Sequence, residues 1–273
     1  MKRLFLLAVV VILINFVNFS GISMPVALEK KNILHENSKS MVEAMPDIKV
    51  MSYNIHRGIN NNGKLDLDGI VNVIRESEAN IIALQEVERF SVRTGFRDQI
   101  EYIADKLSMK YAYGKSINIL NGQYGNAILS KFPIEDYEVS KLPSNGEGRT
   151  ILRTGLNVYG YRILFYSTHL GLDQGERDMQ VEEIVRLIAD DKYTMVLGDF
   201  NSKADKLGAI TERYIDCAGF ENNYDIATFE GKGLSERIDY IFVSKDFRVK
   251  KYDVQKRDAS DHYAIISTLE LID

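Results

Sequence analysis

One stretch of this sequence restricts its possible folds more than any other, namely an apolar run that ends abruptly in polar residues. It is Tyr193–Ser202, with the letters YTMVLGDFNS. A short apolar run bounded in this way is typical of a buried strand. Asp199 and Asn201 follow at its end, and side chains two positions apart on an extended chain point to the same side. A carboxylate beside an amide suits a site that handles a phosphate and a water, whereas the structural alternative is a turn or a cap.

Polar residues also stand at or near the ends of other predicted strands. The runs Ile48–Tyr53, Ile81–Leu84 and Tyr161–Thr168 are rich in residues that favour strands. The polar residues are Asn54, His56, Glu86, His169, Asp239, Asp261 and His262. Taken singly, several have ordinary structural explanations: a solvated acid for Glu86, a loop histidine for His169, a buried acid for Asp239 and a helix or turn cap for Asp261. Their repeated position beside strands predicts one shared site at the edge of a sheet.

Apolar residues at helical spacing separate several of these strands. One such pattern covers Leu67–Ile74 and follows Asp66, which is placed to cap a first turn. Two more cover Ile100–Leu107 and Val181–Ile188. Further strands are expected at Gly125–Ser130, Thr150–Val158 and Arg237–Val243, with a hairpin turn at Tyr159 and Gly160. This alternation predicts an α/β fold in which two sheets pack face to face with helices outside.

The amino-terminal residues differ from the rest of the chain. Lys2 and Arg3 precede an apolar run, Leu4–Val17, which is typical of a secretory signal or an uncleaved membrane anchor. Both alternatives place the protein outside the cytoplasm, either secreted or tethered to the membrane. We therefore divide the chain into a signal peptide or anchor at 1–24, a linker at 25–47 and a folded domain at 48–273. The single Cys217 allows no intramolecular disulfide, so the core alone must hold the domain.

Composition weighs against two classes of protein. Residues 48–273 contain 29 Lys and Arg against 35 Asp and Glu, a net charge of −6. Proteins that bind duplex DNA without sequence preference usually carry a basic face, so this charge weighs against them. The chain has no Trp, and no apolar insertion stands out between the predicted strands. Both absences weigh against an enzyme that works at a bilayer surface.

Seven short motifs, in this order, resemble the endonuclease/exonuclease/phosphatase superfamily, whose fold is that of deoxyribonuclease I. They are Ser52–Asn54, Leu84–Val87, Tyr124–Ser130, Ser167–His169, Gly198–Asn201, Arg237–Ile241 and Ser260–His262. Together they cover the predicted domain from Ile48 to Leu271. The resemblance implies a four-layer α/β/β/α sandwich of two packed sheets flanked by helices, with one metal-dependent phosphoesterase site.

The resemblance also implies a set of metal ligands. Glu86, Asn54 and Asp261 match the positions that bind a divalent metal, either Mg²⁺ or Mn²⁺. Their oxygen atoms are the hard ligands that Mg²⁺ prefers. Outside these positions, Arg149 and His56 are weaker candidates for binding substrate.

The remaining motif residues match catalytic positions of the superfamily. Asp199 corresponds to the acid that orients or deprotonates the attacking water, and Asn201 to the amide that holds a phosphate oxygen. His262 corresponds to a histidine that donates to the phosphate and pairs with Asp239. His169 matches a second position that contacts the phosphate.

We expect a divalent-metal-dependent phosphoesterase that hydrolyses a phosphodiester or phosphomonoester by in-line attack of an activated water. The substrate is a small molecule, a lipid head group or a nucleic acid, and the acidic domain favours a small or flexible phosphoester over long duplex DNA. The main alternative is a secreted DNA or RNA endonuclease or exonuclease. An alternative of another class is a noncatalytic module that binds a phosphate ligand. We expect a monomer, and no protein partner is evident from the sequence.

Overall fold

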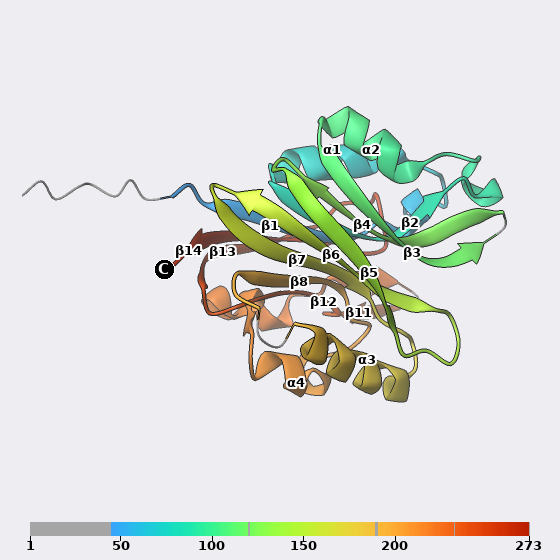
Figure 1. Cartoon of the computed structure of the whole chain (residues 1–273). Coiled ribbons are helices and arrows are strands. Elements are labelled where there is room, and N and C mark those ends of the chain that lie inside the picture. The colour runs from blue at the N-terminus through green and yellow to red at the C-terminus, as the bar shows by residue number, and fades with distance from the viewer. Residues whose placement is uncertain (1–44, 120, 189–190, 232, 273) are drawn as a thin grey trace, which may run out of the picture. The chain divides into compact units, whose positions relative to one another are not determined.

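The computed structural model describes residues 45–119, 121–188, 191–231 and 233–272 (Figure 1). They belong to one unit of the chain, Ala44–Asp273. The predicted signal or anchor at 1–24 and nearly all of the predicted linker at 25–47 lie outside the described residues. Among the residues that the structure describes, no helix is long and apolar enough to cross a membrane.

Two six-stranded sheets form the centre of this unit. The first sheet contains, in spatial order, β13 (Phe247–Gln255), β14 (Ala264–Leu271), β1 (Ile48–Asn54), β2 (Ile81–Arg89), β4 (Gly122–Ser130) and β3 (Lys110–Ile119). The second contains β5 (Ile134–Leu142), β6 (Arg149–Val158), β7 (Tyr161–His169), β8 (Thr194–Asp199), β12 (Asp239–Val243) and β9 (Ile215–Asp216). A separate hairpin joins β10 (Phe229–Gly231) to β11 (Leu234–Glu236).

The central strands are apolar on both faces because each sheet is covered on both sides. In β1, Val50 belongs to the core between the two sheets, whereas Met51 and Tyr53 belong to the core beneath the helices. In β8, Leu197 belongs to the core between the two sheets, and Val196 belongs to the core beneath the helices of the second sheet. Strands buried on both faces appear in a sequence as nearly continuous apolar runs. The run in β8 follows this pattern, whereas β1 was recognised because Ile48–Tyr53 is rich in residues that favour strands.

Helices cover the outer face of each sheet, which gives the predicted four layers (Figure 1). The first sheet is covered by α1 (Leu67–Ser77) and α2 (Gln99–Leu107), and the second by α3 (Gln174–Leu187) and the short α4 (Gly208–Thr211). As predicted, the Asp66 carboxylate caps α1 by accepting a hydrogen bond from the Gly69 amide at 2.8 Å. The fold class expected from the sequence is confirmed.

Strand register brings polar side chains from three strands of the second sheet together. In the parallel pair β7–β8, His169 lies opposite Asp199, and in the antiparallel pair β8–β12, Asp239 also lies opposite Asp199. Gly198 allows the close approach of β7, because a Cβ atom there would lie 2.0 Å from the carbonyl oxygen of Thr168. The registers of the sheet therefore fix the centre of the site.

Candidate active site

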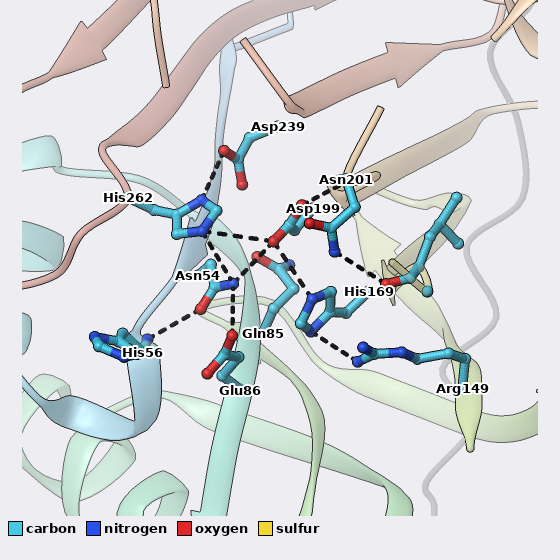
Figure 2. Close-up of polar contacts among 12 residues, drawn as sticks. Asn54, His56, Gln85, Glu86, Arg149, His169, Asp199, Asn201, Asp239 and His262 are labelled. Atoms are coloured by element: carbon cyan, nitrogen blue, oxygen red, sulfur yellow. Dashed lines mark hydrogen bonds and ion pairs between the residues drawn. The ribbon is translucent and has the colours of Figure 1, made fainter. Parts of the chain in front are cut away.

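A cavity of about 590 Å³ lies where these strand ends meet. Eight of the ten site residues predicted from the sequence line it: His56, Glu86, Arg149, His169, Asp199, Asn201, Asp261 and His262. The other two, Asn54 and Asp239, are buried and bond directly to residues of that lining (Figure 2). The fold thus gathers all ten predicted residues around one cavity.

The Asp199 carboxylate is the centre of the cluster and is 1% exposed. Its Oδ1 accepts a hydrogen bond from the Asn201 amide at 2.8 Å, and its Oδ2 accepts one from Asn54 Nδ2 at 3.0 Å. The same Oδ2 lies 3.4 Å from His169 Nε2 and 3.6 Å from His262 Nε2. Burial raises the pKa of Asp199 above its ordinary value, although the charge of His262 acts in the opposite direction. A carboxyl group whose pKa is raised in this way can exchange a proton near neutral pH.

His262 is held in its charged form by two carboxylates. Its Nδ1 lies 2.9 Å from Asp239 Oδ2, which also accepts a hydrogen bond from the Thr228 hydroxyl at 2.6 Å. Burial lowers the pKa of His262, but Asp239 and Asp199 outweigh burial and raise that pKa to about 10. The ring of Phe229 packs against the imidazole, with centroids 4.8 Å apart. At neutral pH both ring nitrogens of His262 therefore carry protons.

His169 has the opposite environment. Its Nδ1 faces the guanidinium of Arg149, with 3.3 Å between Nδ1 and Nη1. Because arginine is only a donor, Nδ1 must carry the lone pair, which leaves the ring proton on Nε2, facing Asp199. Burial, followed by the charges of Arg149 and His262, holds the pKa of His169 well below its ordinary value. One histidine of the site is thus neutral and the other charged.

Glu86 lies inside β2 and not beyond its end, which corrects the strand end predicted at Leu84. The pairing of β2 with β4 breaks between Leu84 and Val87, so Glu86 sits in a bulge. Its φ of 58° is in the left-handed region, which a residue with a side chain rarely adopts outside constrained sites. Glu86 Oε1 accepts a hydrogen bond from Asn54 Nδ2 at 3.3 Å. The bulge therefore turns this carboxylate toward the cavity.

Asp261 and His56 lie on the rim of the cavity. Asp261 Oδ1 is 3.5 Å from His56 Nδ1, and both side chains are partly exposed. The His56 amide donates to Asn54 Oδ1 at 3.0 Å, so this residue also holds Asn54 in place. Asn201 Nδ2 donates to the carbonyl of Leu170 at 3.0 Å, which leaves its second N–H available.

The described residues offer one compact group of possible metal ligands and, apart from it, two carboxylates that line the cavity. Ligand atoms of Asp199, Asp239 and His262 lie within 4.8 Å of one another. However, a metal binds neutral imidazole, and both nitrogens of His262 face carboxylates that favour its protonated form. Glu86 and Asp261 instead supply oxygen atoms to the same cavity, with side chains 19% and 30% exposed. This oxygen set fits the preference of Mg²⁺ for one or two carboxylates and retained waters.

Several residues of the site were not predicted from the sequence. Thr228 and Phe229 support Asp239 and His262, and Arg57 and Arg93 line the cavity. Gln85, the neighbour of Glu86, bridges the two sheets through its Nε2, which donates to Ser167 Oγ at 3.3 Å. Gln85 was within a recognised motif, whereas no short pattern in the sequence marks the other four.

The sequence from residue 51 to residue 262 matches the model of the Endonuclease/Exonuclease/phosphatase family, and the chain belongs to that family. Enzymes of this family generally hydrolyse phosphoester bonds and generally depend on a divalent metal. The match begins at β1 and ends at His262, so it includes every candidate site residue.

Individual proteins resemble the chain in sequence. The uncharacterized protein YbhP of Escherichia coli (strain K12) is 32% identical over 181 residues, which cover 58% of this chain and 70% of YbhP. Protein cwh43 of Schizosaccharomyces pombe is 30% identical over 147 residues, which cover 53% of this chain but only 15% of cwh43.

Solved structures share the fold. An endonuclease/exonuclease/phosphatase from Beutenbergia cavernae superposes with a TM-score of 0.69 at 20% identity, covering 83% of this chain and 72% of that one. Truncated TDP2 of Caenorhabditis elegans superposes with a TM-score of 0.65 at 24% identity, covering 82% of this chain and 97% of that one. At such identities the likeness establishes the architecture alone.

Proposed function

We propose that this protein is a divalent-metal-dependent phosphoesterase that hydrolyses its substrate by in-line attack of a water molecule. One observation carries the proposal: a buried carboxylate, Asp199, lies between a charged histidine and a neutral one, beside the oxygen ligands of Glu86 and Asp261. General base, proton donors and cation ligands are the groups that phosphoester hydrolysis requires.

Each group has a role that follows from its chemistry. Asp199 accepts the proton of the attacking water, and its raised pKa favours that transfer near neutral pH. The imidazolium of His262 donates to a phosphate oxygen and neutralises charge that develops in the transition state. His169 directs its single ring proton at Asp199 Oδ2, so it orients the base. A cation held by Glu86 and Asp261, with the Asn54 oxygen nearby, would supply further charge neutralisation.

Among phosphoesters, we favour a small or flexible one. A cavity of about 590 Å³ falls within the usual range of small-molecule sites, roughly 300–1,000 Å³. Arg57, Arg93 and Arg149 line it, and guanidinium groups suit phosphate oxygens. A soluble metabolite, a lipid head group or the end of a nucleic acid strand shares this chemistry. We further propose that the protein acts outside the cytoplasm, as a monomer.

Substitution of Glu86 tests the proposal. Glu86→Gln removes one charge from the cation site while keeping the size of the side chain, so both metal affinity and rate should fall. A loss of several kcal/mol of charge stabilisation corresponds to a decrease of about 100-fold or more in kcat/KM. The measurement is hydrolysis of a soluble phosphodiester with Mg²⁺ or Mn²⁺, with and without chelator.

The matched control is Glu138→Gln, which makes the same change on the exposed edge strand β5. It should behave as wild type. Full turnover in chelator, or an unchanged rate in Glu86→Gln, would contradict the metal assignment. Absence of turnover on every phosphodiester, phosphomonoester, phospholipid and nucleic acid tried would instead favour the noncatalytic binding module.

A further inference from the structure

The loop between β2 and α2 exposes three large apolar side chains. This loop, Arg89–Asp98, has Phe90, Val92 and Phe96 at 47%, 50% and 62% exposure. Single exposed apolar residues are normal on soluble proteins, but a group of three within seven residues requires an explanation. In the sequence they are separated by polar residues, so no apolar insertion stands out there.

The backbone of the loop is held in one shape. The Phe90 amide donates to the Arg97 carbonyl at 2.9 Å, and the Phe96 amide donates to the Ser91 carbonyl at 2.8 Å. At the base of the loop, the guanidinium of its first residue bonds the carboxylate of its last. Both phenylalanines have φ values in the left-handed region, 57° and 59°. This conformation is unfavourable for bulky residues, so holding the two side chains outward costs conformational free energy.

Two arginines lie among these apolar side chains in the sequence. Arg93 and Arg97 are both exposed residues of the same loop. Arg93 also bonds to the buried carboxylate of Glu88 and lines the catalytic cavity. Apolar groups flanked by arginines are complementary to a surface whose phosphates lie above acyl chains.

The loop adjoins the active-site cavity, because one of its residues, Arg93, lines that cavity. It begins three residues after Glu86 in the same strand. Leu172, which follows β7, lines the same cavity and is 77% exposed. A segment from each sheet therefore carries exposed apolar side chains and also contributes a residue to the lining of this cavity.

We propose that the Arg89–Asp98 loop docks the domain on a phospholipid bilayer, with the active-site cavity facing the lipid. Phe90, Val92 and Phe96 enter the boundary between head groups and acyl chains, while Arg93 and Arg97 contact lipid phosphates. Three side chains offer far less area than the roughly 800 Å² per partner of a stable protein interface. Insertion into a bilayer, in contrast, needs only a small apolar area together with a few cationic groups.

Tryptophan fluorescence tests the proposal, because the chain contains no Trp. In the full chain, Phe96→Trp places a single fluorophore at the tip of the loop. Vesicles of phosphatidylcholine with phosphatidylglycerol should shift its emission to the blue, and brominated acyl chains should quench it. Adding Phe90→Ser should raise the lipid concentration at half-maximal shift by roughly tenfold or more, because burial of a phenylalanine is lost.

The matched control is Tyr159→Trp. Tyr159 is an aromatic residue with 46% exposure and a φ of 53°, and it lies in the turn between β6 and β7, at the other end of β7 from His169. Its emission should not respond to vesicles, even if the amino-terminal segment inserts.

No response of Phe96→Trp to any vesicle would overturn the proposal. So would a response to a single-stranded oligonucleotide without one to vesicles, which would make the loop a nucleic acid surface. Fluorescence reports this contact whether or not the protein hydrolyses a phosphoester. The docking proposal and the proposed activity therefore fail independently.

Discussion

The two histidines of the site show how neighbouring residues set opposite proton states within one buried cluster. His262 faces the carboxylate of Asp239, and His169 faces the guanidinium of Arg149. The two rings are buried to nearly the same degree, with 6% and 5% exposure, so their partners explain the difference in pKa. A sequence motif identifies the histidines, but the partner of each ring is known only from the fold.

Asp239 and His262 should act as one unit. Asp239→Asn removes the larger of the charges that raise the pKa of His262, so that pKa should fall. His262 would then lose its proton at a lower pH, and the alkaline limb of kcat/KM should move toward neutrality. Single and double substitutions of Asp239→Asn and His262→Ala, assayed across pH, measure this effect. Additive losses and an unmoved alkaline limb would show that the pair is not coupled.

Arg149 should fix the tautomer of His169. Arg149→Met removes the donor that faces Nδ1, so the pKa of His169 should rise toward its ordinary value. Nitrogen NMR of the imidazole rings measures the proton positions, and the chain has only four histidines to assign. Arg149→Lys keeps the charge and serves as the comparison. If Nδ1 were protonated in wild type at neutral pH, the assignment would be wrong.

At the scale of elements, strand-to-strand register explains why the Gly198-Asp199 sequence lies at the centre of the site. Gly198→Ala would drive a Cβ atom into the Thr168 carbonyl of the neighbouring strand and separate β7 from β8. We expect a loss of about 1–3 kcal/mol in the free energy of unfolding, as for other overpacked positions. For a domain of this size each kcal/mol lowers Tm by about 2–4 °C.

Gly146→Ala is the control for this substitution, since a Cβ at Gly146 would meet nothing within 4 Å. Thermal unfolding followed by circular dichroism compares the two variants with wild type. Equal Tm values for all three proteins would contradict the importance of the close approach at Gly198.

Elements buried on both faces were predictable from the sequence, and edge elements were not. The runs that became β2 and β8 were recognised because they contain continuous apolar stretches, and those that became β1 and β7 because they are rich in residues that favour strands. The strands β3 and β5 were missed because they lie at sheet edges and mix exposed with buried residues.

In the candidate site, too, some residues were predictable from the sequence and others were not. Its motif residues stood beside recognisable strands and were all gathered by the fold. Thr228 and Phe229 were missed because they lie at the start of the short strand β10 and reach Asp239 and His262 only through tertiary packing. The left-handed backbone conformation of Glu86 was not predicted either, because a bulge does not change the apolar pattern of the sequence.

At the scale of the whole molecule, net charge should limit any action of this protein on duplex DNA. The domain carries a net charge of −6, so few phosphates can be neutralised at once. A protein with 6–10 phosphate contacts loses about 10³–10⁵ in affinity between 50 and 200 mM salt. For this protein we expect the affinity for plasmid DNA to fall by less than roughly tenfold over the same salt range. The measurement is plasmid nicking, compared with hydrolysis of a soluble phosphodiester. Efficient nicking with a steep salt dependence, and no turnover of the small ester, would identify a nuclease.

The pairing of β1 with β14 joins the beginning of the domain to its end. Asn54 closes the first strand and His262 precedes the last, and their side chains meet at Asp199. During synthesis the site therefore cannot assemble until nearly the whole domain has been made, because the strand that seats His262 comes last. We therefore expect a polypeptide that stops before His262 to lack the proposed hydrolytic activity.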